Sequence, residues 1–186
     1  MTPFEHLSVL ISIILGLGIA QLLWTFHQLV QARSRVRFYW LPLTWSALIF
    51  VAIVEWWWVS FGMRTQSEWN FFYFLFVLLR PVTAYLSAAF VLPTPEPATP
   101  IDLRRYYFDN RRWLFALLAA GNLLDGLRRV LEGTPFAEVA VWSNFVSCLL
   151  LVSLALSRSV RYHTVLTLLT AGLFALFILR AALELV

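Results

Sequence analysis

The sequence predicts an all-α integral membrane protein, a polytopic bundle of six transmembrane helices. Composition is the first observation: 61% of the 186 residues are hydrophobic and 13% are charged. A soluble domain has about 45–50% apolar and about 25% charged residues. The second observation is a series of long apolar stretches, each near the roughly 20 residues that a helix needs to cross a bilayer.

Six stretches meet this length, and they span residues 4–30, 40–61, 69–92, 111–131, 136–156 and 163–185. The first has no basic segment before it and is too long for the apolar region of a signal peptide, so we expect a permanent helix. The connections between the stretches are short. They leave no room for a soluble catalytic domain, and we expect one compact membrane domain.

The arginines predict an orientation. Nine of them gather in three alternate connections: Arg33, Arg35 and Arg37; Arg104, Arg105, Arg111 and Arg112; Arg158 and Arg161. Because basic residues favour the cytoplasmic side, these connections are expected in the cytoplasm and both termini in the periplasm, as for a bacterial inner-membrane protein. Membrane orientation accounts for the basic charge, so no nucleic-acid partner is expected.

Similarities between the halves favour an inverted repeat of three helices each. The first half would span 1–92, a proline-rich cytoplasmic linker 93–110, and the second half 111–186, with Asp109 or Asn110 capping its first helix. The matches are collinear at nearly constant spacing, as transporter repeats require: 21–23 with 122–124, 45–46 with 142–143, and 79–80 with 179–180. Against strict symmetry, Arg80 lies near mid-span and Arg180 near the outer end.

Small side chains recur every four residues in the first stretch, at Ser8, Ser12, Gly16 and Ala20. Such a strip lets helix backbones approach closely in lipid. The alternative is a polar face that lines a pore. The partner helix can belong to this chain or to another copy, and we expect a homo-oligomer.

Charged residues within the apolar stretches are the candidate site. An ionisable group there costs about 2.5–3.5 kcal/mol on insertion scales, and marks either a function or an internal pair. The polar residues concerned are Arg80, Glu55, Asp125, Asn122 and Arg180. Most are expected in the outward half of the membrane.

Arg80 has the most unusual position, because Pro81 follows it and removes a helical hydrogen bond to the Val77 carbonyl, which predicts a kink. Arg80 can bind an anion or carboxylate through its planar fork, or join a relay with the two acids. The structural interpretation is that Arg80 pairs with Glu55 or Asp125 and fixes helix register.

No motif of a hydrolase, a phosphate loop or a metal site is present, so we expect no enzyme, no metal and no cofactor. The chain has no lysine for a Schiff base and only one cysteine, Cys148. The leading hypothesis is a small channel or transporter for an ion or small polar solute. The alternative is a non-transporting subunit, an assembly or sensor protein whose buried charges are structural. A lipid- or pigment-binding role, resting on the aromatic content, is third.

Overall fold

The computed structural model describes residues 3–65, 69–96 and 99–184, without the side chains of residues 3, 65, 177–178 and 180–184. Within these residues the fold is all-helical, which confirms the predicted class. The six α-helices are α1 Pro3–Gln31, α2 Trp40–Ser60, α3 Phe71–Val91, α4 Leu103–Leu131, α5 Val139–Leu156 and α6 Val160–Glu184. The short elements are η1 Arg33–Arg35, β1 Val36–Arg37, η2 Phe61–Thr65 and β2 Ile101–Asp102.

Four helical segments of the described chain are long and apolar enough to cross a membrane: Phe4–Gln31, Trp40–Arg64, Phe71–Val91 and Val139–Leu156. The prediction of six spans is therefore not confirmed, and four of the predicted spans correspond to helices that could cross a membrane. The apolar part described for α6 is the shorter Val160–Leu176. The predicted span 111–131 lies within α4. This helix is not apolar enough to meet the same criterion, because arginines and acids occupy both of its ends.

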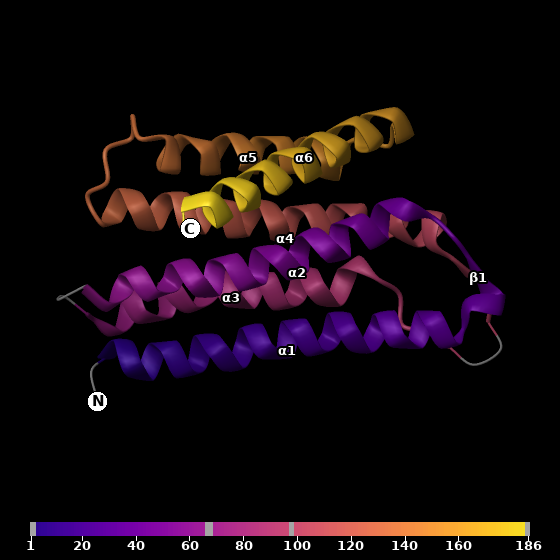
Figure 1. Cartoon of the computed structure of the whole chain (residues 1–186), viewed down its shortest axis with the longest axis horizontal. Helices are drawn as coiled ribbons and strands as arrows, with labels where there is room; N and C mark the ends of the chain where they lie inside the picture. The colour runs from indigo at the N-terminus through magenta and orange to yellow at the C-terminus, as the bar shows by residue number, and fades with distance from the viewer. Residues whose placement is uncertain (1–2, 66–68, 97–98, 185–186) are drawn as a thin grey trace.

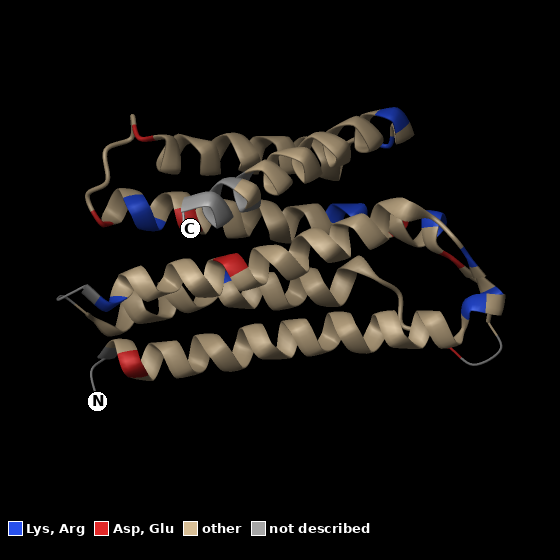
Figure 2. Ribbon diagram, viewed as in Figure 1, with Lys and Arg blue, Asp and Glu red and all other residues tan. Residues whose placement is uncertain are grey.

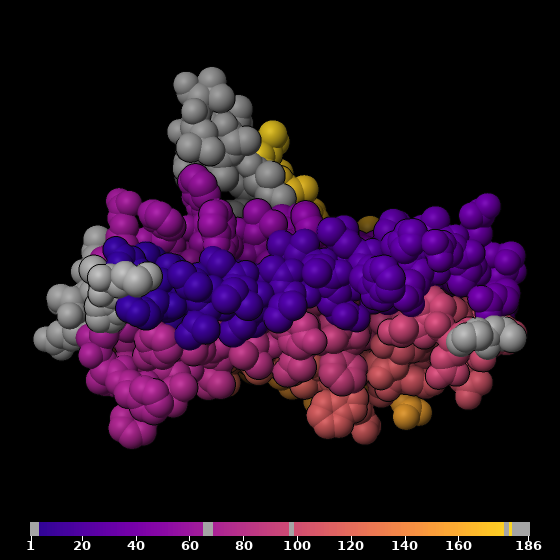
Figure 3. All heavy atoms as spheres, turned by 90° about the horizontal axis from the view of Figure 1, so that it is seen from below, coloured from indigo at the N-terminus to yellow at the C-terminus, as the bar shows by residue number. Residues whose placement is uncertain are grey.

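The polar helix α4 lies between the other helices (Figure 1). It separates α5 on one side from α3 on the other, and it packs directly on both. Helix α1 packs on α2 and α3 and covers one face of the molecule (Figure 3). Helix α6 packs chiefly on α2.

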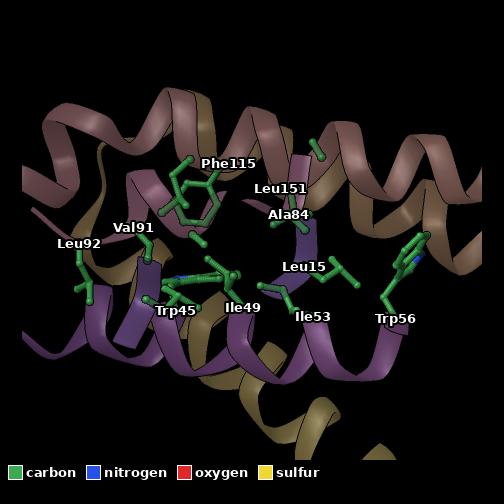
Figure 4. Packing of buried hydrophobic residues seen from close by; sticks show 14 of the residues in the cluster. Leu15, Trp45, Ile49, Ile53, Trp56, Ala84, Val91, Leu92, Phe115 and Leu151 are labelled. Carbon is green, nitrogen blue, oxygen red and sulfur yellow. The ribbon is translucent and has the colours of Figure 1, made fainter. Parts of the chain in front are cut away.

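The core follows a stripe on α2. Trp45, Ile49, Ile53 and Trp56 recur every three or four residues, so they share one helix face, and all four are buried. Figure 4 shows this stripe together with side chains from the neighbouring helices, which are Leu15 of α1, Ala84 of α3, Phe115 of α4 and Leu151 of α5.

Two connections are tied together at one end of the bundle. Strand β1, between α1 and α2, pairs in parallel with β2, between α3 and α4, with Val36 opposite Ile101. Helix α4 then begins at Leu103, because Asp102 accepts a hydrogen bond of 2.9 Å from the backbone N–H of Arg105 and caps it. The predicted cap at Asp109 or Asn110 and the linker boundary at 110 are wrong, since 103–110 is helical.

Within the described residues, the small-residue strip of α1 makes few contacts, one of which is a hydrogen bond of 3.1 Å from Trp57 Nε1 of α2 to Ser12 Oγ. Ser12, Gly16 and Ala20 are exposed, Ser8 donates to the carbonyl of its own helix at Glu5, and a Cβ at Gly16 would meet nothing within 4 Å. The close approach is instead at Gly18, where a Cβ would lie 3.5 Å from the Tyr85 Cα of α3. The strip remains a prediction for contacts between copies.

The inverted repeat is not confirmed, because the two halves pack differently. Helix α1 packs on both α2 and α3, whereas its counterpart α4 packs on α5 and makes far less contact with the described part of α6. The match of Arg80 with Arg180 is not tested, since the Arg180 side chain lies outside the described residues.

Candidate functional site

Arg80 and Asp125 form an ion pair between α3 and α4. Arg80 Nε donates to Asp125 Oδ2 over 2.9 Å, and the two side chains are only 17% and 14% exposed. Trp56 of α2 completes the centre, since its Nε1–H donates to Asp125 Oδ1 over 3.0 Å and its ring faces the Arg80 guanidinium, 5.7 Å from centroid to Cζ. Of the two acids expected to pair with Arg80, the structure selects Asp125.

Helix geometry makes room for the guanidinium. Gly121 of α4 lies against it, and a Cβ there would be 3.2 Å from Arg80 Nη1 and 3.0 Å from Thr83 Oγ1. Such distances are tighter than ordinary van der Waals contacts, so the absence of a side chain at Gly121 lets Arg80 reach across α4. Pro81 lies inside α3, as predicted, and Thr83 Oγ1 donates to the Arg80 carbonyl over 2.7 Å.

Arg128 extends the charged cluster along α4. Its Nε lies 3.9 Å from Asp125 Oδ1, and its Nη1 donates to both Glu132 oxygens over 2.7 Å. Tyr73 of α3 also donates to Glu132, over 2.6 Å. Asp125 is therefore shared between two arginines. Sequence reasoning missed Arg128 as a site residue because it looked like part of a connection, although its spacing of three from Asp125 is a helical ion-pair signal.

Glu55 lies at the edge of this cluster. It is half-buried on α2, within electrostatic range of Asp125, Arg80 and Arg129, but makes no hydrogen bond or ion pair with the part of the chain that the structure describes. The Nε atom of Arg129 is likewise buried with no hydrogen-bond partner among the described residues. Within the described part of the chain, Glu55 and Arg129 are thus charged groups not held in a fixed pair.

A cavity of about 230 Å³ adjoins the ion pair, where α2, α3, α4, α5 and α6 converge. Its polar lining comprises Trp45, Arg80, Thr83, Ser87, Asn122, Ser147 and Thr170. The rest is apolar: Leu48, Ile49, Ala52, Leu117, Leu118, Leu150, Leu151, Leu154, Leu166, Leu169, Leu173 and Phe174. A largely apolar space with a few convergent polar groups is the usual character of a small-molecule site.

Two predicted site residues line this cavity, Arg80 and Asn122. Asn122 donates from Nδ2 to the Leu118 carbonyl over 2.9 Å. Arg80 uses only Nε in the hydrogen bonds within the described residues, so its two Nη nitrogens are the donors left for a guest. Asp125 lies behind Arg80 and holds it. The Arg180 side chain lies outside the residues that the structure describes.

A second polar cluster, which was not predicted from the sequence, is buried in the bundle. Tyr107 of α4 and His163 of α6 are hydrogen-bonded over 2.9 Å, and Trp45 Nε1 donates to Thr167 Oγ1 over 2.9 Å. His163 Nε2 lies 3.2 Å from the Ser157 carbonyl, which can only accept. In its neutral form, the ring therefore carries the proton on Nε2, and Tyr107 O–H donates to Nδ1. The i,i+4 spacing of His163 and Thr167, which places both on one helix face, is the feature of the sequence that could have predicted this cluster.

Basic residues gather at the end of the bundle where β1 lies (Figure 2). Arg37 pairs with Asp102 there over 3.4 Å. The hydrogen bond from the Arg105 backbone N–H, together with nearby arginines, lowers the pKa of the Asp102 carboxyl. In α4, this arginine-rich end is separated from Asp125 by an uncharged stretch, 113–124.

Comparison of the chain with protein families, with curated proteins and with solved structures found no match.

Proposed function

We propose that this protein is a small membrane transporter or channel for an ion or small polar solute, with Arg80, Glu55 and Asp125 at its centre. The observation that carries the proposal is the cavity of about 230 Å³ beside a buried arginine whose Nη donors have no partner in the described chain. A buried charge that served only to join helices would gain nothing from an adjoining space, since empty volume forfeits packing.

The arrangement supports movement as well as binding. Helix α6 supplies one wall of the cavity but packs chiefly on α2, so this wall is less tied to the bundle than the others. Glu55 and Arg129, which lack fixed pairs among the described residues, can rebalance the charge when a solute enters or leaves. Both features suit a site that opens to two sides in turn.

Flux in proteoliposomes tests the proposal. Protons, chloride and small organic solutes would be supplied as gradients to the wild type and to the double variant Arg80→Gln/Asp125→Asn, which removes the pair without leaving a lone buried charge. We expect flux from the wild type and its loss in the double variant. A double variant that is folded and transports at the wild-type rate would contradict the assignment. Gly16→Ala, far from the cavity, serves as the matched control.

The alternative is a non-transporting subunit, and one observation favours it. Asp125 is satisfied by Arg80, Trp56 and Arg128 together, as expected of a network that fixes helix register. Under this alternative a cavity-filling substitution such as Ser147→Leu leaves the activity of the protein in the cell intact, whereas breaking the Arg80–Asp125 pair abolishes that activity. Under the transport proposal both changes abolish the activity.

Orientation and assembly belong to the same proposal. The arginine-rich end that carries β1 would face the cytoplasm by the positive-inside rule, with both termini in the periplasm of a bacterial inner membrane. The exposed α1 strip of Ser8, Ser12, Gly16 and Ala20 would join copies of the chain in a homo-oligomer.

A further inference from the structure

We infer that the cavity beside Arg80 binds a small monocarboxylate with a short apolar tail. The inference rests on the proposed function and gives it a substrate class. It follows from three properties of the site. These are the two Nη nitrogens of Arg80, which make no hydrogen bond within the described residues, the charges around Arg80, and the size and lining of the cavity.

The head group is set by the Arg80 guanidinium. This group is planar and carries five N–H donors, which match a carboxylate through two parallel hydrogen bonds. Asp125 occupies one edge through Nε, at 2.9 Å. The edge formed by the two Nη nitrogens makes no hydrogen bond within the described residues, and Arg80 lines the cavity. That edge fits a second carboxylate.

The charge around Arg80 permits a second anion. Asp125 does not serve Arg80 alone, because Arg128 Nε lies 3.9 Å from its other oxygen. Arg129 lies in electrostatic range of Glu55, the other acid near Arg80, and its buried Nε has no hydrogen-bond partner among the described residues. Arg128 thus offsets part of the repulsion between Asp125 and an incoming carboxylate, and Arg129 offsets part of the repulsion from Glu55.

The tail is set by the rest of the lining, most of which is leucine from α4, α5 and α6. An inorganic anion would leave these side chains against empty space, whereas an alkyl chain would bury against them. A cavity of about 150 Å³ holds benzene, with its six carbons. By proportion, about 230 Å³ accommodates roughly nine non-hydrogen atoms. A carboxylate of about five to seven carbons fits this volume.

Equilibrium binding of radiolabelled hexanoate tests the inference, with the protein in lipid nanodiscs and empty nanodiscs as the background. Competition by unlabelled compounds separates head from tail: hexanol lacks the carboxylate, formate lacks the tail, and dodecanoate exceeds the volume. We expect hexanoate to compete at least tenfold better than each of the other three. Hexanol or formate competing as well as hexanoate would overturn the inference, and dodecanoate doing so would identify a lipid-derived acid instead.

A matched pair of variants places the binding in this cavity. Ser147 of α5 lines it, whereas Ser143, one turn earlier on the same helix, does not. Ser147→Leu should weaken hexanoate binding at least tenfold, and Ser143→Leu should leave it unchanged. Equal binding by the two variants would overturn the location.

The two proposals fail separately. Binding is measured without a gradient, so hexanoate that binds but is never transported would refute the transport function alone. Flux of another solute by a protein that does not bind hexanoate would refute the substrate class alone.

Discussion

Arg80 of α3 and Asp125 of α4, 45 residues apart in sequence, are joined through Nε and Oδ2 over 2.9 Å inside the bundle. Trp56 of α2 donates to the same carboxylate, so one acid links three helices. Without Arg80, Asp125 would keep only Arg128 as an ion-pair partner, whereas Arg80 without Asp125 would have none among the described residues. The pair therefore joins α3 to α4 whether or not it also takes part in transport.

Breaking the pair on one side should destabilise the protein more than removing both sides. Asp125→Asn leaves Arg80 without an ion-pair partner in the described chain and should cost about 3–5 kcal/mol in the free energy of unfolding. Arg80→Gln leaves Asp125 with Arg128 and should cost less. The double variant should cost clearly less than their sum. Thermal or denaturant unfolding in a fixed detergent measures this. Strictly additive costs would show that the two residues do not interact.

Adding one methyl group at Gly121 should displace the guanidinium. The new Cβ would lie 3.2 Å from Arg80 Nη1, so Gly121→Ala should reduce solute flux severalfold while leaving a folded protein. Gly16→Ala is the control, since its Cβ meets nothing within 4 Å, and the loss of a helical glycine should be neutral or stabilising by up to about 1 kcal/mol. Unchanged flux in Gly121→Ala would remove Arg80 from the solute path.

The buried tryptophan–threonine hydrogen bond predicts a stability cost at α6. Thr167→Val keeps the shape but leaves the Trp45 N–H without its acceptor. We expect a loss of about 1–3 kcal/mol, the cost of an unsatisfied buried group, rather than the average of about 0.6 kcal/mol for a hydrogen bond between membrane helices. Thr164→Val, on the same helix and with no hydrogen bond in the described chain, should be neutral. Equal thermal midpoints for the two variants would contradict this.

The Asp102 cap predicts a pH-dependent contribution to stability. Its pKa is lower in the folded protein than the ordinary value near 3.9. The folded state therefore binds the proton less readily, so this stabilisation is present above about pH 4 and is lost as pH falls through the folded pKa. Asp102→Asn retains a capping side chain without the charge. The gap in thermal midpoint between wild type and this variant should exist at pH 7 and narrow as the pH falls below about 4.

Assembly should depend on the outer face of α1. Gly16→Ile places a branched side chain in the small-residue strip without touching the core, because nothing in the described fold lies within 4 Å of that Cβ. The proposed homo-oligomer should dissociate into monomers, as measured by light scattering of the detergent-solubilised particle, with Gly16→Ala retaining the wild-type mass. An unchanged mass in Gly16→Ile would exclude this strip as the interface.

Charges inside apolar stretches were the most predictable part of the site. Arg80, Glu55 and Asp125 are conspicuous from sequence because lipid penalises them. The choice of Asp125 over Glu55 as the partner of Arg80 was not predictable, since it depends on Gly121 lying where the guanidinium crosses α4. The cavity also depends on how five helices converge, which no local pattern encodes.

The start of α4 was missed for a different reason. Residues 103–110 are rich in arginine and lie after a proline-rich segment, so they read as a loop, whereas the Asp102 cap begins a helix there. The buried cluster around His163 was hidden because a tyrosine or histidine near a membrane boundary has the same sequence appearance at an interface and in a core.

The polar character of α4 has a consequence for how the chain is made. Four helical segments carry enough hydropathy to be retained by a bilayer on their own, and α4 is not among them. It nevertheless lies between them, held by Arg80 on one side and by the surface of α5 on the other. The place of α4 in the bundle therefore depends on what its neighbours offer its charged and polar groups, and not on its own hydropathy.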